Sequence, residues 1–221
     1  VSFELAAGER VAIIGESGVG KSTIADLLVR HADPLRGVVL LDGVDVRTLT
    51  LATLRRHVLT VETDPFVFHA TLAANLRVAA PDADEASLLR ALSLVGLAPW
   101  LATLPDALAT VVGERGRAMS TGERQRLALA RAVLADPRIL ILDEATGALD
   151  PATEAAILNA MDGWLAARTV ILITHRPAVA ALAPRSIVLR AGRVVADAPT
   201  AELLGRGAMA GGETAPVSAG A

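Results

Sequence analysis

Short apolar runs, each followed by a polar or glycine-rich segment, recur along this chain and predict an α/β fold. Three such runs lie at residues 10–14, 139–142 and 169–173. A continuous apolar run of this length is typical of a strand that is buried on both faces of a parallel sheet. Residues 23–31 and 124–135 have helical spacing instead. We therefore expect a mainly parallel sheet with helices packed against it.

The middle of the chain predicts a helical subdomain, at about residues 70–135. Four apolar residues there form an amphipathic pattern, and we expect their stripe to be core: Leu88, Leu89, Leu92 and Val95. Another segment, the last 17 residues (205–221), is rich in Gly, Ala, Ser and Pro. It has no apolar periodicity, so we expect a disordered tail.

Composition and charge narrow the class of protein. The chain has 221 residues, of which 52% are hydrophobic and 20% charged, and its net charge is −3. These values suit a globular domain with a large core, and we expect no nucleic-acid partner because no basic field is present. Without cysteine there is no disulfide, thiolate zinc site or cysteine nucleophile. The longest charge-free stretch, Ala91–Pro105, is shorter than the roughly 20 apolar residues that a membrane span needs.

The stretch "GESGVGKST" predicts a phosphate-binding loop, since it matches G-x-x-x-x-G-K-[ST] between an expected strand and an expected helix. Its glycines let backbone N–H groups surround an anion, and the following helix adds its positive dipole end. Lys21, the sequence's only lysine, would reach the β- and γ-phosphates of ATP. The expected nucleotide contacts are Gly15, Glu16, Ser17, Gly18, Val19, Gly20, Lys21, Ser22 and Thr23. A glycine-rich turn with a surface lysine is the alternative.

Polar side chains follow two of the expected buried strands. In "LILDEATGALD" we assign Asp143, together with the Ser22 hydroxyl, to Mg²⁺, and Glu144 to orienting or deprotonating the attacking water. His175 ends the next strand, and we expect it to contact the γ-phosphate. Ligands bind at the carboxyl ends of strands in open α/β sheets, which favours these roles. The alternative is that charged residues simply close each strand.

A second helix entrance, "MSTGERQR" at residues 119–126, also has the features of an anion site. Ser120 can cap the helix and offer its hydroxyl to a phosphate, and Gly122 leaves the backbone N–H accessible. In the plainer interpretation Ser120 and Glu123 form an ordinary capping box. The two interpretations are compatible, and this helix should end at Asp136-Pro137.

Four motifs resemble the nucleotide-binding domain of ABC transporters, and the resemblance covers residues 1–204: in chain order they are "GESGVGKST", "STGERQRLALARA", "LILDEATGALD" and "ITHR". The resemblance implies a P-loop NTPase core with a helical signature subdomain, and ATP sandwiched between two domains arranged head to tail. Ser120 and Gly122 of the signature motif (residues 119–123) would then face the other domain's ATP, and Asp150 would communicate across the dimer. The implied partners are a second ABC domain, identical or different, and a transmembrane domain of the same or another polypeptide. The implied location is the cytoplasmic face of the membrane.

Two further segments, Gly37–Val58 and Thr110–Gly116, resemble those of bacterial ABC exporters, in which the second touches the membrane domain. The implied function is ATP hydrolysis that powers export. The sequence also resembles one half of a heterodimeric exporter, such as the cysteine/glutathione exporter associated with cytochrome bd assembly. Because the chain opens at Val1 without a methionine, we expect a transmembrane region and the adenine-stacking aromatic residue to lie upstream.

The sequence departs from the family at two motifs. Thr63 stands where glutamine is usual, with Glu62 before it. In the signature, Thr121 stands where a first glycine is usual, and Glu123 stands where glutamine is usual. The departures keep open a non-hydrolysing regulatory half of a heterodimer. A non-transport ABC ATPase acting on DNA or ribosomes is disfavoured by the acidic charge and by the segment at 110–116.

Overall fold

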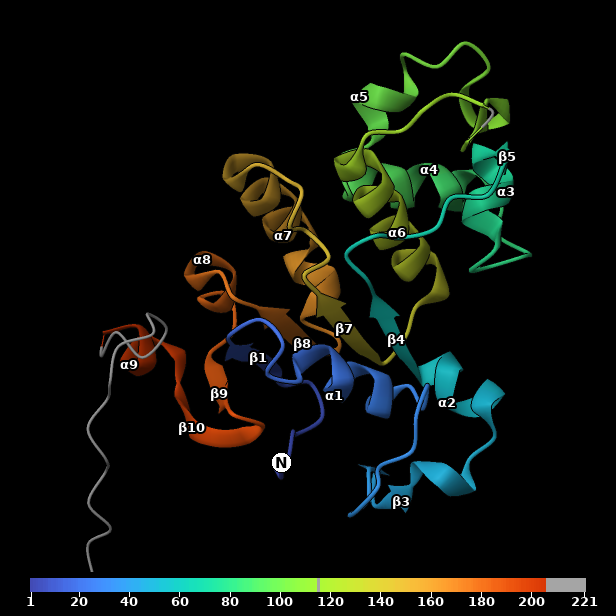
Figure 1. The fold of residues 1–221 in the computed structure, drawn as a ribbon. Helices are drawn as coiled ribbons and strands as arrows, with labels where there is room; N and C mark the ends of the chain where they lie inside the picture. The colour runs from blue at the N-terminus through green and yellow to red at the C-terminus, as the bar shows by residue number, and fades with distance from the viewer. Residues whose placement is uncertain (115, 206–221) are drawn as a thin grey trace, which may run out of the picture.

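A six-stranded sheet runs through the middle of the molecule (Figure 1). The computed structural model describes residues 1–114 and 116–205. The strand order is β10-β9-β1-β8-β7-β4, and all neighbours are parallel except β10 and β9. These strands are β1 (Arg10–Gly15), β4 (Val58–Val61), β7 (Ile139–Asp143), β8 (Thr169–Thr174), β9 (Arg185–Arg190) and β10 (Arg193–Pro199). The predicted α/β class with a mainly parallel sheet is confirmed.

Two small antiparallel pairs and a set of helices complete the described residues. The pairs are β2 (Leu40–Leu41) with β3 (Val44–Asp45), and β5 (Ala70–Thr71) with β6 (Val111–Val112). The α-helices are α1 (Lys21–Leu28), α2 (Leu51–His57), α3 (Leu72–Arg77), α4 (Glu85–Leu94), α5 (Ala98–Leu101), α6 (Thr121–Ala135), α7 (Pro151–Leu165), α8 (Pro177–Ala180) and α9 (Thr200–Gly205). Short 3-10 helices lie at Val46–Thr48 and Ala107–Ala109. Among the described residues 1–114 and 116–205, no helix is both long enough and apolar enough to cross a membrane.

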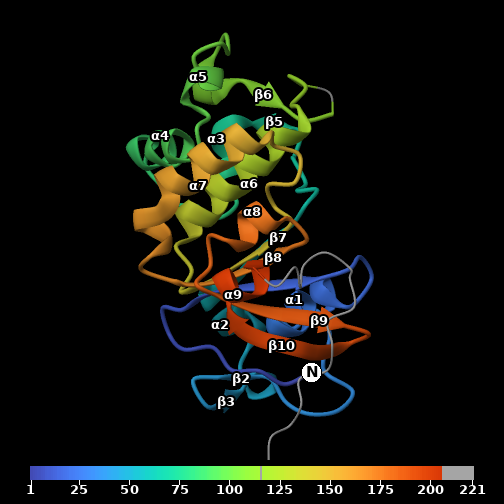
Figure 2. The ribbon, with the colours of Figure 1, turned by 90° about the vertical axis from the view of Figure 1, so that its left-hand side faces the viewer.

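Alternating strand residues build two core layers, one on each face of the sheet. In β1, Val11 and Ile13 join the layer that also holds residues of α1 and α2, such as Ile24 and Leu54. Their neighbour Ala12 joins the larger layer, which contains residues of α3, α4, α6, α7 and α8. Since successive side chains of a strand point to opposite faces, both faces need apolar residues. Figures 1 and 2 show α1 and α2 on one side of the sheet and α6, α7 and α8 on the other. The two expected phosphate-facing helices, α1 and α6, therefore belong to opposite layers.

Helices α3 to α6 form the lobe at the upper right of Figure 1. The predicted apolar stripe of α4 is buried at Leu88, Leu92 and Val95, but the prediction is wrong at Leu89, which is 40% exposed. Spacings of four and three residues keep Leu88, Leu92 and Val95 on one face of the helix, and Leu89 lies beside that face. The end of α6 at Ala135 agrees with the expected stop, and Asp136 caps it in the left-handed region. The domain limits stay a prediction, and residues 206–221 of the predicted tail lie outside the described residues.

Candidate functional site

The loop between β1 and α1 has the backbone of a phosphate cradle. Gly18 and Gly20 have positive φ angles of 79° and 103°, which favour glycine. Gly15 is required for a different reason, because a Cβ atom there would lie 2.6 Å from the carbonyl oxygen of Leu189. The helix α1 then begins at Lys21, so its first N–H groups border the loop.

Lys21 lies across this loop rather than out in solvent. Its ammonium group donates hydrogen bonds to the carbonyl oxygens of Gly15 and Glu16, at 2.8 and 2.9 Å, and the residue is only 6% exposed. The positive charge is thus held at the mouth of the loop, where a phosphate oxygen would be its natural counter-charge.

Asp143, at the carboxyl end of β7, is brought next to the phosphate loop. The Ser22 side chain lies close enough to the Asp143 carboxylate to lower its pKa, so the two residues assigned to Mg²⁺ are neighbours. Burial raises the pKa of Asp143, with Glu144 and Asp26 acting in the same direction, while Ser22 and Lys21 lower it. A half-buried carboxylate beside a hydroxyl offers the oxygen ligands that Mg²⁺ prefers, and this ion usually takes its other ligands from phosphate and water. Within the described residues no cluster of three or more His, Cys, Asp or Glu side chains suits a metal ion.

Glu144 and His175 meet at the ends of β7 and β8. The His175 Nδ1 and Glu144 Oε1 atoms are 2.9 Å apart, and the two side chains are 62% and 32% exposed. The backbone of Glu144 has a φ angle of 49°, and its N–H donates to the carbonyl oxygen of Ile173 at 3.0 Å. This left-handed conformation turns the chain sharply after the strand. The sequence predicted both residues for the site, and the structure pairs them directly.

A buried ion pair lies beneath this Glu–His pair, and sequence reasoning missed it. Glu154 of α7 is 4% exposed and binds the Arg176 guanidinium through both carboxylate oxygens, at 3.0 and 2.8 Å. Thr146 donates a short hydrogen bond to the same carboxylate. All three residues line one pocket together with Glu144 and His175. The pair therefore ties the segment that follows β8 to the loop that follows β7.

The start of α6 is rigidly capped. Ser120 and Glu123 form the expected capping box, in which the Ser120 hydroxyl accepts from the Glu123 N–H at 3.2 Å and the Glu123 carboxylate accepts from the Ser120 N–H at 2.7 Å. A Cβ on Gly122 would lie 3.0 Å from the Leu149 side chain, so this glycine also permits close packing. Asp150 caps α7, and hydrogen bonds from Thr153 lower its pKa.

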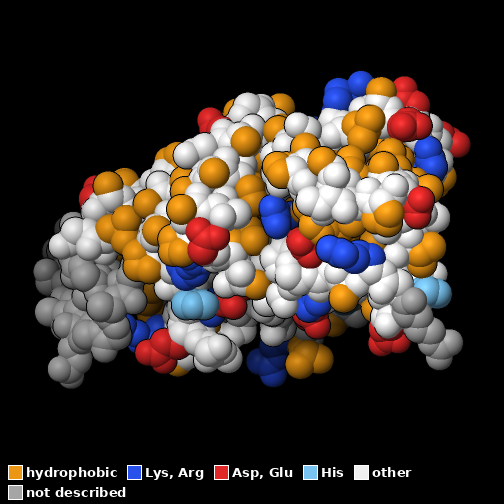
Figure 3. All heavy atoms as spheres, turned by 90° about the horizontal axis from the view of Figure 1, so that it is seen from above, with side chains coloured by type: hydrophobic (Ala, Val, Ile, Leu, Met, Phe, Trp, Pro, Cys, Tyr) orange, Lys and Arg blue, Asp and Glu red, His pale blue; other side chains and the backbone are white. Residues whose placement is uncertain are grey.

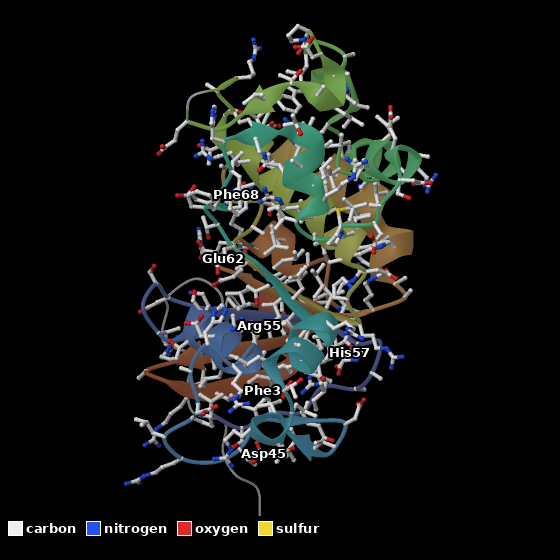
Figure 4. All side chains as sticks on the ribbon, turned by 90° about the vertical axis from the view of Figure 1, so that its right-hand side faces the viewer. Phe3, Asp45, Arg55, His57, Glu62 and Phe68 are labelled. Atoms are coloured by element: carbon white, nitrogen blue, oxygen red, sulfur yellow. The ribbon has the colours of Figure 1, made fainter. Side chains whose placement is uncertain are left out.

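The segment that follows β4 contacts the same region through Thr63. The Thr63 hydroxyl donates to the carbonyl oxygen of Asp143 at 3.1 Å. Its own carbonyl oxygen accepts from the side chain of Gln125, at 2.8 Å. Glu62 is exposed beside it, and Figure 4 shows Glu62 and Phe68 on the stretch that leads from β4 toward the helical lobe. Gln125 was not among the predicted site residues.

Farther along this stretch, two aromatic rings face solvent. Phe66 and Phe68 are 70% and 44% exposed and pack edge to face with ring centres 4.9 Å apart. Arg131 of α6 fixes their segment by donating to the Phe66 carbonyl oxygen at 2.7 Å, and Gly113 packs so closely that a Cβ would lie 2.9 Å from the Phe68 carbonyl oxygen. The helical side of the molecule, seen from above in Figure 3, mixes hydrophobic side chains with charges of both signs.

Comparisons with known proteins agree with this geometry. Residues 1–147 match the family model described as ABC transporter. A beta-(1-->2)glucan export ATP-binding/permease protein of Rhodopseudomonas palustris (strain BisB18) is 46% identical over 206 residues, which cover 93% of this chain and 34% of the relative. A mycobactin import ATP-binding/permease protein of Mycolicibacterium thermoresistibile is 45% identical over 207 residues, which cover 94% of this chain and 36% of the relative.

A solved structure of a bacterial Atm1-family ABC exporter with ATP bound superimposes on this fold with a TM-score of 0.88 and 42% identity. The match covers 93% of this chain and 36% of that chain. The chain thus spans about a third of the length of the relatives that it matches.

Proposed function

Because this chain belongs to the ABC transporter family, we propose that it is the ATP-binding and ATP-hydrolysing domain of a bacterial exporter. The observation that carries the proposal is a convergence at the carboxyl ends of three adjacent strands, β1, β8 and β7. The first leads into the phosphate loop, the second into His175, and the third into Asp143 and Glu144. Such a convergence is the expected location of a ligand site in an open α/β sheet.

In the proposed mechanism, the phosphate loop positions the nucleotide. Backbone N–H groups of residues 15–23 and the start of α1 surround the phosphates, and the Lys21 ammonium compensates the charge of the β- and γ-phosphates. Ser22 and Asp143 hold Mg²⁺, which when bound neutralises charge that develops on the phosphate oxygens. Their proximity supports this assignment, because two oxygen ligands lie side by side.

Glu144 and His175 act on the attacking water and the γ-phosphate. The Glu144 carboxylate orients the water and accepts its proton as the new oxygen–phosphorus bond forms and the bond to the β-phosphate oxygen breaks. His175 contacts the γ-phosphate. Their hydrogen bond of 2.9 Å supports this division of roles, since it keeps both groups within reach of one reacting centre.

The start of α6 serves a second ABC domain in this proposal. Ser120 and Gly122 face the ATP that is held by the phosphate loop of that domain, in a head-to-tail dimer, and Asp150 communicates across the interface. Support comes from the layers of the fold, because α1 and α6 pack on opposite faces of the sheet. The partner domain is identical or different in sequence.

The transmembrane partner docks beside the exposed aromatic pair. Phe66, Phe68 and the segment around Gly113 form one packed surface, and the relatives named above are ATP-binding/permease proteins. We place the domain at the cytoplasmic face of the membrane, where ATP is available. One relative is named for export and another for import. The direction and the substrate of transport thus depend on the membrane domain.

A second candidate is a non-hydrolysing regulatory half of a heterodimer. It is favoured by Thr63, which stands in place of the usual glutamine of this family and donates its hydroxyl to the Asp143 carbonyl oxygen. The intact pair of Glu144 and His175 favours hydrolysis.

Steady-state ATP turnover of the full-length protein that contains this chain decides between the two. With Glu144→Gln, turnover should fall about 100-fold or more while ATP binding persists, as expected for loss of a general base. The matched control is Glu85→Gln, the same chemical change on the exposed first turn of α4, which should leave turnover unchanged. Equal turnover in the wild type and Glu144→Gln would refute hydrolysis by this site, and ATP binding with no wild-type turnover would establish the regulatory half.

A further inference from the structure

Gln125, the sequence's only glutamine, makes two hydrogen bonds that join distant segments of the chain. It lies in the second turn of α6 and is fully buried, at 0% exposure. Its Nε2 atom donates to the Thr63 carbonyl oxygen at 2.8 Å, and its Oε1 atom accepts from the Ala148 N–H at 3.1 Å. Both ends of the amide are therefore used, each on a backbone group of a different segment.

Each of these segments leads to the hydrolytic residues. Thr63 donates its hydroxyl to the Asp143 carbonyl oxygen, so that Gln125 is two hydrogen bonds away from that backbone. Ala148 lies within the loop between β7 and α7, which begins with Glu144. The next residue of this loop, Leu149, packs against Gly122 in the first turn of α6. The first two turns of α6 thus contact both segments that border the carboxyl end of β7.

The chemistry of the amide suits a positioning role better than a stabilising one. Thr63 and Ala148 are exposed residues and both hydrogen bonds are only partly buried, so nearby water lowers the cost of losing them. The net contribution of each bond to stability is then small, on the order of 1 kcal/mol. What water cannot supply is a fixed distance between α6 and the two segments.

We propose that Gln125 is a positioning residue that couples the start of α6 to the loop that carries Glu144. The inference rests on the proposed function, in which the start of α6 faces the partner's ATP and Glu144 acts on the chain's own ATP. A shift of α6 when the partner's nucleotide binds is transmitted by the amide to Ala148 and Thr63. One side chain thereby links the two nucleotide sites in which this chain takes part.

The test uses Gln125→Met, which keeps the length and volume of the side chain and removes both hydrogen bonds. In the full-length protein we expect kcat for ATP to fall about tenfold, with KM within about twofold of wild type because the phosphate loop is untouched. Gln125→Glu keeps an acceptor for the Ala148 N–H and loses the donor to Thr63, so its kcat should lie between those of the wild type and Gln125→Met. Hydrogen exchange of the 147–150 backbone with ATP bound should become faster in Gln125→Met.

The control is Ser186→Ala, which removes the buried hydrogen bond of 2.7 Å to Thr200, between β9 and α9. It should lower stability by a similar amount and leave kcat and the exchange of residues 147–150 unchanged. If Gln125→Met also leaves both unchanged, Gln125 only packs the core and the proposal is wrong. If the wild type itself does not hydrolyse ATP, the proposed function fails, and the exchange of the 147–150 backbone still decides whether Gln125 holds this loop.

Discussion

Separating Arg176 from Glu154 should destabilise the protein and slow hydrolysis together. The two carboxylate oxygens of Glu154 bind one guanidinium at 3.0 and 2.8 Å, with Thr146 as a third partner. Arg176→Met leaves a carboxylate that is 5% exposed with only the threonine hydroxyl to bond. An unpaired buried charge of this kind is the main cost of breaking a buried ion pair.

The magnitude follows from how far each partner is buried. Breaking a fully buried pair costs about 3–5 kcal/mol. The Arg176 side chain is 24% exposed, so water already weakens the interaction, and we expect a loss of about 2–3 kcal/mol. In a protein of this size, that corresponds to a decrease of roughly 4–12 °C in the unfolding temperature.

Thermal unfolding of four forms measures the pair directly: wild type, Arg176→Met, Glu154→Leu and the double variant. The double variant leaves no unpaired charge, so its loss should be at least about 1 kcal/mol smaller than the sum of the single losses. As control, Asp162→Asn removes an ion pair in which the acid is 63% exposed, and it should cost less than about 1 kcal/mol.

Turnover of the same variants tests the functional part. Arg176 follows His175 in the chain, and Thr146 comes two residues after Glu144, so loosening the pair moves both members of the Glu144–His175 hydrogen bond. We expect kcat to fall several-fold in each single variant. The reasoning would be refuted if the stability losses of the two single variants were additive in the double variant. It would also be refuted if the single variants lost the expected stability without any change in kcat.

Three more predictions follow from the site. Asp143→Asn should abolish Mg²⁺-dependent turnover. With a chelator present it should raise the free energy of unfolding, because burial raises the pKa of the Asp143 carboxyl and so disfavours its charged form. In unfolding measured against pH, this gain in stability should be absent below the ordinary pKa of 3.8 and complete above the raised pKa of the folded protein. Gly15→Ala should destabilise the protein by about 2 kcal/mol, because its Cβ would lie 2.6 Å from the Leu189 carbonyl oxygen, and should weaken ATP binding measured by titration calorimetry. Thr63→Val should lower ATP turnover several-fold through the lost hydrogen bond to the Asp143 backbone, while Glu62→Ala should not; a reversal of that order would show that Glu62 replaces the usual glutamine.

Local patterns were enough to predict much of this molecule. The apolar runs identified β1, β7 and β8, the glycine pattern identified the phosphate loop, and the spacing of Ser120 and Glu123 identified the cap of α6. Each of these signals comes from residues that are close together in the sequence, where backbone geometry and side-chain chemistry are strongly linked.

The remaining features depend on contacts between distant segments. Gln125 bonds Thr63, 62 residues earlier, and nothing near it in the sequence indicates that partner. Glu154 and Arg176 are 22 residues apart. Taken one at a time, their sequence surroundings suggest an acid on a helix surface and a base at the end of a strand. The prediction placed Leu89 in the core because the residue is apolar, but the sequence does not show which side of α4 the rest of the lobe covers. Tertiary packing decided all three.

The left-handed backbone of Glu144 has a consequence for protein engineering. A non-glycine residue with a φ angle of 49° costs on the order of 1–2 kcal/mol, so a sequence optimised for thermostability alone would place glycine or asparagine there. Such a library, screened by melting temperature, would enrich variants that have lost the carboxylate. A thermostable form of this domain should therefore be sought by substitutions elsewhere, with position 144 held constant and activity measured in the same screen.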